Sequence, residues 1–111
     1  MRAHIYQMDL TPENIRLCFA PYEYVLKECC GQIPSERYAH VYSLEVGAED
    51  PEALYALLNF HHPSDYTARS LSVSDVIEFE HPDGSNVFYY CDTIGFKAIS
   101  FDRNAAHAPT P

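Results

Sequence analysis

The sequence predicts an α+β fold: a mainly antiparallel sheet of four or five strands with two or three helices packed on one of its faces. Three observations predict it. Short segments rich in β-branched and aromatic residues recur along the chain. Two other segments combine helical start signals with apolar residues at helical spacing. A glycine-containing turn joins two neighbouring strand-like segments, which is typical of an antiparallel hairpin.

Strands are expected where apolar and polar residues alternate or where β-forming residues cluster. The pattern in the C-terminal half is the clearest, because Gly84 lies in a polar turn between two such segments and can supply its positive φ. The expected strands cover residues 4–9, 38–46, 76–80, 87–91 and 98–101.

Two helices are predicted by their first residues. Pro21 begins a segment whose apolar residues recur at helical spacing until Gly31 ends it. The second helix is expected over 51–61, because Asp50 can accept hydrogen bonds from free N–H groups and Pro51 suits the first helical position.

Length and composition indicate one folded domain. The chain has 111 residues, of which 47% are hydrophobic and 21% charged, a balance typical of globular proteins. We expect the domain over 4–101 and a disordered tail over 102–111. No apolar run is long enough to cross a membrane, and the N-terminus has no signal-peptide pattern, so a cytoplasmic location is expected.

The formal charge of −9 argues against general nucleic-acid binding, which relies on basic side chains that neutralise phosphates. It is compatible with an acidic DNA mimic. The four cysteines form no CxxC motif, and in a cytosolic chain such residues are usually small buried hydrophobes. Neither a cofactor nor a metal is expected, and the sequence does not indicate the oligomeric state.

The segment from Arg69 to Ile77 contains the most distinctive pattern. Serines at 70, 72 and 74 alternate with apolar residues, which predicts a strand with one buried face. The alternation slips at Asp75, which predicts a turn or bulge that redirects the chain. Two interpretations stay open here: the polar side chains tie the loop down, or they form a recognition surface.

Three groups of residues carry a resemblance to a known family. They are Asn59-Phe60-x-His62-Pro63-x-Asp65-Tyr66, the run from Arg69 to Val76, and Tyr89-Tyr90-x-Asp92-x-x-Gly95-Phe96. Together they resemble the YodL-like domain family over residues 4–100. The resemblance implies a bacterial domain, often associated with mobile or conjugative elements, to which no reaction or catalytic residue is assigned.

The favoured interpretation is a non-enzymatic module that binds a protein partner through the loop between 59 and 75. The residues expected at that surface are Asn59, His62, Tyr66, Arg69, Ser70, Ser72 and Asp75. The alternative is a small hydrolase or metal-dependent enzyme, since imidazole, carboxylate and thiol groups can act as bases, metal ligands or nucleophiles. Its residues would be His61, His62, Asp65 and Cys91.

Overall fold

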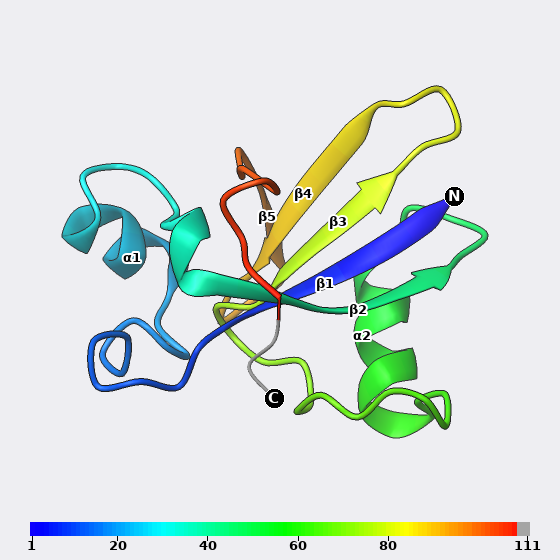
Figure 1. Cartoon of the computed structure of the whole chain (residues 1–111), viewed down its shortest axis with the longest axis horizontal. Helices are drawn as coiled ribbons and strands as arrows, with labels where there is room; N and C mark the ends of the chain where they lie inside the picture. Colours follow the sequence, from blue (N-terminus) through cyan, green and yellow to red (C-terminus); the bar gives the residue numbers. More distant parts are fainter. Residues whose placement is uncertain (109–111) are drawn as a thin grey trace.

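Five strands form one antiparallel sheet in the computed structural model, which describes residues 1–108 (Figure 1). The sheet has the order β2-β1-β3-β4-β5, so the N-terminal strand lies inside it. The α+β class is therefore confirmed. The strands are β1 (Arg2–Met8), β2 (Tyr38–Glu45), β3 (Val76–Glu80), β4 (Asn86–Cys91) and β5 (Phe96–Ile99).

Two α-helices accompany the sheet, α1 (Tyr22–Glu28) and α2 (Pro51–Phe60), with a short 3₁₀ helix over Ser35–Arg37. The expected capping of α2 is present, because the Asp50 carboxylate accepts a hydrogen bond from the Ala53 N–H at 3.0 Å. Among residues 1–108, no helix has the length and apolar character needed to cross a lipid bilayer.

The helices lie on opposite faces of the sheet, which corrects the prediction that both pack on one face (Figure 1). Val25 of α1 belongs to the same apolar cluster as Tyr6. Leu58 of α2 belongs to a second cluster with Ile5. Tyr6 and Ile5 are neighbours in β1, and successive side chains of a strand point to opposite faces. Each helix therefore covers its own face.

The segment 70–73 is not a strand, contrary to the alternating pattern of its residues. The backbone of Leu71 is bound by one side chain instead: its N–H donates to Asn59 Oδ1 at 2.7 Å, and its carbonyl accepts from Asn59 Nδ2 at 3.0 Å. The predicted turn is present. Ser74 has a φ of +85°, and its carbonyl accepts a hydrogen bond from the Tyr38 hydroxyl at 2.6 Å. The chain then enters β3.

Residues 102–108 lie against the domain, where the sequence predicted a disordered tail; the rest of that expected tail, 109–111, lies outside the described residues. The segment leaves β5 and crosses the sheet toward the start of β2 (Figure 1). Phe101, the residue before this segment, packs its ring against those of Tyr6 and Tyr38, with ring centroids 4.9 and 5.3 Å apart. His107 then forms a bridge with Ala39.

Candidate functional site

A buried carboxylate, Asp75, lies at the centre of a polar network between β1 and the 59–75 loop. Its side chain is 0% exposed. The Oδ2 atom accepts hydrogen bonds from Gln7 Nε2 at 3.1 Å and from the Ser72 N–H at 2.9 Å. The Arg69 guanidinium lies 3.7 Å from the other oxygen. Burial disfavours the charged carboxylate and raises the pKa of Asp75 to about 7.

Both the backbone and the side chain of Arg69 are held by internal contacts. Its carbonyl accepts hydrogen bonds from the Tyr66 hydroxyl at 2.6 Å and from Gln7 Nε2 at 2.9 Å. Its guanidinium donates to the Met8 carbonyl at 2.9 Å and lies 5.8 Å from the centre of the Phe19 ring, within the range of a cation–π contact. Burial raises the pKa of Tyr66 to about 12, so that its hydroxyl stays a donor. The side chain of Arg69 is nevertheless 29% exposed.

Three buried side-chain atoms within residues 1–108 have no hydrogen-bond partner, and all three belong to this network. They are Arg69 Nε, Ser72 Oγ and Asp75 Oδ1. Such atoms are rare in native proteins because each forfeits the hydrogen bond it would make to water. All three lie around the 3.7 Å contact between Arg69 and Asp75.

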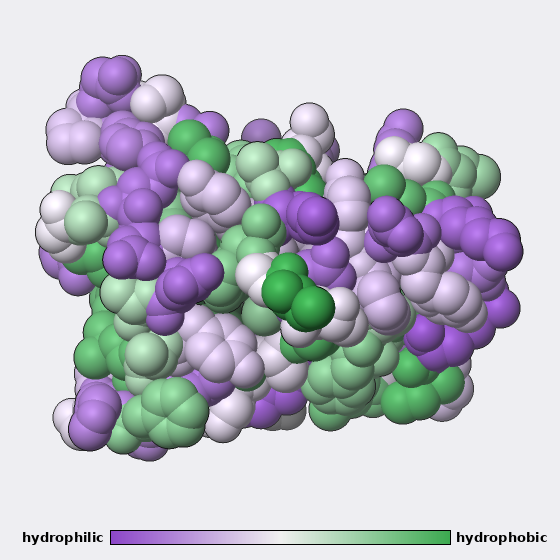
Figure 2. Space-filling view, turned by 180° about the vertical axis from the view of Figure 1, so that it is seen from behind, coloured by the Kyte–Doolittle hydropathy of each residue, from purple (hydrophilic) through white to green (hydrophobic). Residues whose placement is uncertain are grey.

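A pocket of about 340 Å³ opens beside Arg69. Two neighbouring apolar side chains reach far into solvent: Leu10, which lines the pocket, is 56% exposed, and Phe19 is 48% exposed. Figure 2 shows apolar residues gathered at the lower right of that view, at the end of the molecule that contains this segment. The pocket is lined by Gln7, Met8, Asp9, Leu10, Thr11, Ala39, Val41 and Arg69.

The structure divides the residues predicted for the binding surface into two groups. His62 and Ser70 are exposed, and Arg69 is partly so. The others are turned inward and support the loop: Asn59, Tyr66, Ser72 and Asp75 all make the internal contacts described above. The polar side chains therefore tie the loop down around Arg69. Whether its exposed residues bind a partner stays a prediction.

The sequence pattern did not indicate that Gln7, Leu10 and Phe19 belong to this site. Gln7 lies in a strand in which every residue after Arg2 is buried, and an unpaired amide would be costly there. A glutamine among apolar strand residues is the signal that could have indicated an internal partner. Phe19 has a φ of +65° and lies in a segment of turns. Because turns have no regular spacing of apolar residues, no periodic pattern in the sequence indicated that its side chain is exposed.

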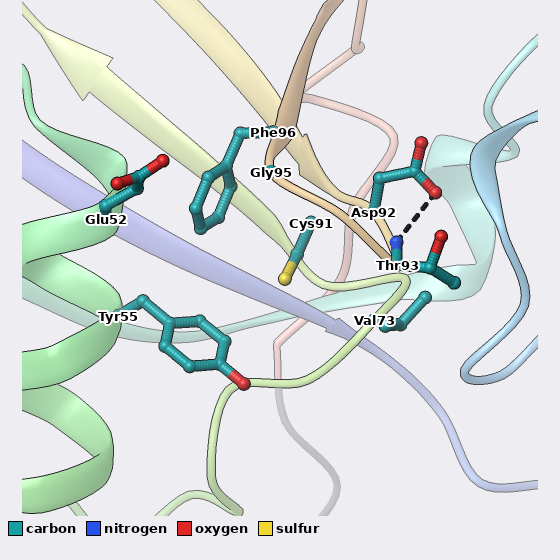
Figure 3. Close-up of a pocket in the computed structure, with 8 residues that line it drawn as sticks. All are labelled: Glu52, Tyr55, Val73, Cys91, Asp92, Thr93, Gly95 and Phe96. Atoms are coloured by element: carbon teal, nitrogen blue, oxygen red, sulfur yellow. Dashed lines mark hydrogen bonds between the residues drawn. The ribbon is translucent and has the colours of Figure 1, made fainter.

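The cysteine of the enzymatic alternative, Cys91, lies at the base of a second pocket, of about 260 Å³ (Figure 3). Its side chain points toward Tyr55 of α2, and its exposed fraction is 5%. Burial raises the pKa of the Cys91 thiol to about 12, whereas a reactive cysteine needs a lowered pKa. The remaining lining residues are Glu52, Val73, Asp92, Thr93, Gly95 and Phe96, which include no imidazole to act as a base.

Labelling of the native protein with a thiol reagent is expected to modify Cys30 at least ~100-fold faster than Cys91. Cys30 is exposed, whereas Cys91 is buried and its raised pKa leaves almost no thiolate at neutral pH. Mass spectrometry of digested samples taken over time measures both rates, and unfolded protein serves as the control in which they converge. Equal rates in the native protein would restore Cys91 as a candidate nucleophile.

The other residues of the enzymatic alternative make local contacts. His62 Nδ1 lies 3.0 Å from the Pro63 carbonyl, and Asp65 accepts a hydrogen bond from the Tyr42 hydroxyl at 2.6 Å. His61 is an exposed residue at the end of α2. Over the described part of the chain, no three His, Cys, Asp or Glu side chains are grouped so that they could hold a metal ion.

The fold and this network define a small α+β domain built around a buried carboxylate and a loop-borne arginine. The family model of the YodL-like domain matches residues 2–101 of the 111-residue chain, and the chain belongs to this family. The predicted resemblance is thereby confirmed. Comparisons with curated proteins and with solved structures find no significant match.

Proposed function

We propose that this domain is a non-enzymatic protein-interaction module whose docking surface is the pocket beside Arg69 together with the exposed side chains of Leu10 and Phe19. The partner that fits this surface presents a carboxylate to the Arg69 guanidinium and an apolar side chain to Leu10 and Phe19. Arginine binds carboxylates through paired hydrogen bonds, and exposed apolar groups beside it add buried area on binding.

The observation that supports this most is the state of Arg69. Its contacts with Met8 and Phe19 fix the guanidinium in one place, so little side-chain entropy would be lost on binding. The molecule is strongly acidic, with seven Lys and Arg residues against sixteen Asp and Glu. A fixed arginine at a pocket in such a surface favours recognition over general charge attraction.

A pull-down with a matched pair of variants tests the proposal. Arg69→Gln removes the cation at the pocket, and Arg16→Gln removes a cation whose side chain is 70% exposed and 3.3 Å from Glu28. Both variants change the net charge equally, so a loss of capture caused by charge alone would affect both. We expect wild type and Arg16→Gln to capture the same protein and Arg69→Gln to lose it.

Each variant is first checked for native circular dichroism and a cooperative melt at pH 6, so that unfolding is not mistaken for lost binding. The captured protein is then purified, and its affinity for the three chains is measured by titration. Equal affinity for wild type and Arg69→Gln, with both folded, would contradict the proposed surface.

A further inference from the structure

The outer edge of β2 is covered at one end by residues 105–108 of the chain itself, which meet it through a single isolated β-bridge. His107 forms a parallel bridge with Ala39. The His40 N–H donates to the His107 carbonyl at 2.9 Å, and the His107 N–H donates to the Tyr38 carbonyl at 3.0 Å. The imidazole adds a side-chain contact, since its Nε2 lies 2.7 Å from Asp9 Oδ2.

This cover is short compared with the strand beneath it. β2 extends to Glu45, yet within residues 1–108 no strand flanks the outer side of its second half. An edge strand offers free N–H and C=O groups to any extended chain. The family match ends at residue 101, so the covering segment lies beyond the matched domain while the edge belongs to it.

The contacts of the cover are also easy to exchange for others. They comprise two backbone hydrogen bonds at the edge, one ion pair in which the side chains of His107 and Asp9 are 40% and 30% exposed, and the packing of Ala106 against the apolar cluster that contains Tyr6. A partner strand that paired along the whole of β2 would replace both backbone bonds and add more.

We propose that the outer edge of β2 is a peptide-binding site that takes an extended segment of a partner protein, parallel to β2, and that residues 105–108 occupy this site within the chain. The partner segment carries an imidazole or basic side chain that meets Asp9, with small residues on either side. This is the chemistry the site holds now, because alanines flank His107.

The inference rests on the proposed interaction function and adds to it the manner of recognition. Asp9 and Ala39, which meet the covering segment, also line the pocket beside Arg69. A strand added at this edge would therefore lie beside that pocket. The two proposals can fail separately, because the pull-down depends on Arg69 and the experiment below depends on His107.

The test uses the full chain and a fluorescent peptide with the sequence of residues 102–111. In wild type the edge is occupied, so the peptide must compete with the attached segment. His107→Pro releases that segment, because proline removes both the N–H that bonds the Tyr38 carbonyl and the imidazole that meets Asp9. We expect fluorescence anisotropy to show at least ~10-fold tighter peptide binding to His107→Pro than to wild type.

Hydrogen exchange locates the bound peptide. The His40 amide is expected to be protected in wild type, to exchange faster in His107→Pro, and to regain protection when the peptide is added, while amides of β3 stay protected throughout as evidence of folding. A peptide in which His107 is replaced by alanine is expected to bind more weakly. Binding to His107→Pro that is no tighter than to wild type, or that leaves the His40 amide unprotected, would overturn the proposal.

Discussion

Wild type is expected to become less stable as the pH rises from 5 to 8, and the Asp75→Asn variant is expected not to show this decrease. The pKa of the Asp75 carboxyl is raised from 3.8 to about 7 by burial. The folded state therefore binds the proton more tightly than the unfolded state does. The contribution of Asp75 to the free energy of unfolding is therefore greatest below about pH 4, falls as the pH rises through 7, and is lowest above pH 7.

The size of the effect follows from the shift. About three pKa units at 1.36 kcal/mol each give a cost of ~4 kcal/mol for the ionised carboxylate. Most of this cost arises between pH 5 and 8. Asparagine keeps an oxygen that accepts from Gln7 and from the Ser72 N–H, but it does not titrate.

Urea unfolding of wild type and Asp75→Asn at pH 5 and pH 8 measures this directly. Groups common to both proteins cancel in the difference between their free energies of unfolding. We expect that difference to change by about 3 kcal/mol in favour of the variant at the higher pH. A difference that is equal at the two pH values would mean that Asp75 does not titrate in this range, and the account of the network's electrostatics would be wrong.

Replacing Asn59 with alanine is expected to lower the free energy of unfolding by about 3 kcal/mol. The Asn59 amide makes two hydrogen bonds to the backbone of Leu71, whose side chain is 2% exposed. Alanine would leave a buried N–H and a buried carbonyl without partners, and each such group costs about 1–3 kcal/mol. The loop that carries Arg69 would lose its connection to α2.

Asn59→Asp is the matched control, because aspartate keeps the oxygen that accepts from the Leu71 N–H but cannot donate to the carbonyl. At neutral pH a carboxylate oxygen would face the Leu71 carbonyl oxygen, so the variant's loss of stability in urea unfolding is expected to be at least as large as that of Asn59→Ala and to shrink at low pH, where the protonated carboxyl can donate. A loss below about 0.5 kcal/mol for Asn59→Ala is typical of an unimportant surface position and would show that the loop is held by other contacts.

Most elements could be predicted from local signals. The cap at Asp50 and the turn at Gly84 act within a few residues, and both elements are found where they were expected. The sequence did not show that helices cover both faces of the sheet. The polar residue Gln7 makes β1 look like a strand with one exposed face, although the Gln7 side chain is buried. The positions of Asp75 and of the Arg69 carbonyl, both distant in sequence, explain why that amide can be buried.

The contacts of the candidate site could be predicted only in part, again because they join residues that are distant in the sequence. Serine and aspartate near a turn are compatible both with internal hydrogen bonds and with recognition. The sequence does not show that Tyr66 reaches the carbonyl of Arg69, or that the guanidinium reaches Met8, since these contacts depend on how the loop crosses β1. Arg69 was assigned to the site from the sequence and that assignment stays a prediction, whereas the pocket beside it can be found only from the fold.

Photo-crosslinking in living cells tests the proposed docking surface most directly. A photoreactive amino acid is placed at Leu10, beside the pocket, and in a second protein at Ile94, which is 89% exposed and does not line that pocket. The account predicts a discrete crosslinked partner from position 10 that is absent from position 94 and is lost when Arg69→Gln is added. The same products from both positions, or a position-10 product that survives Arg69→Gln, would contradict it.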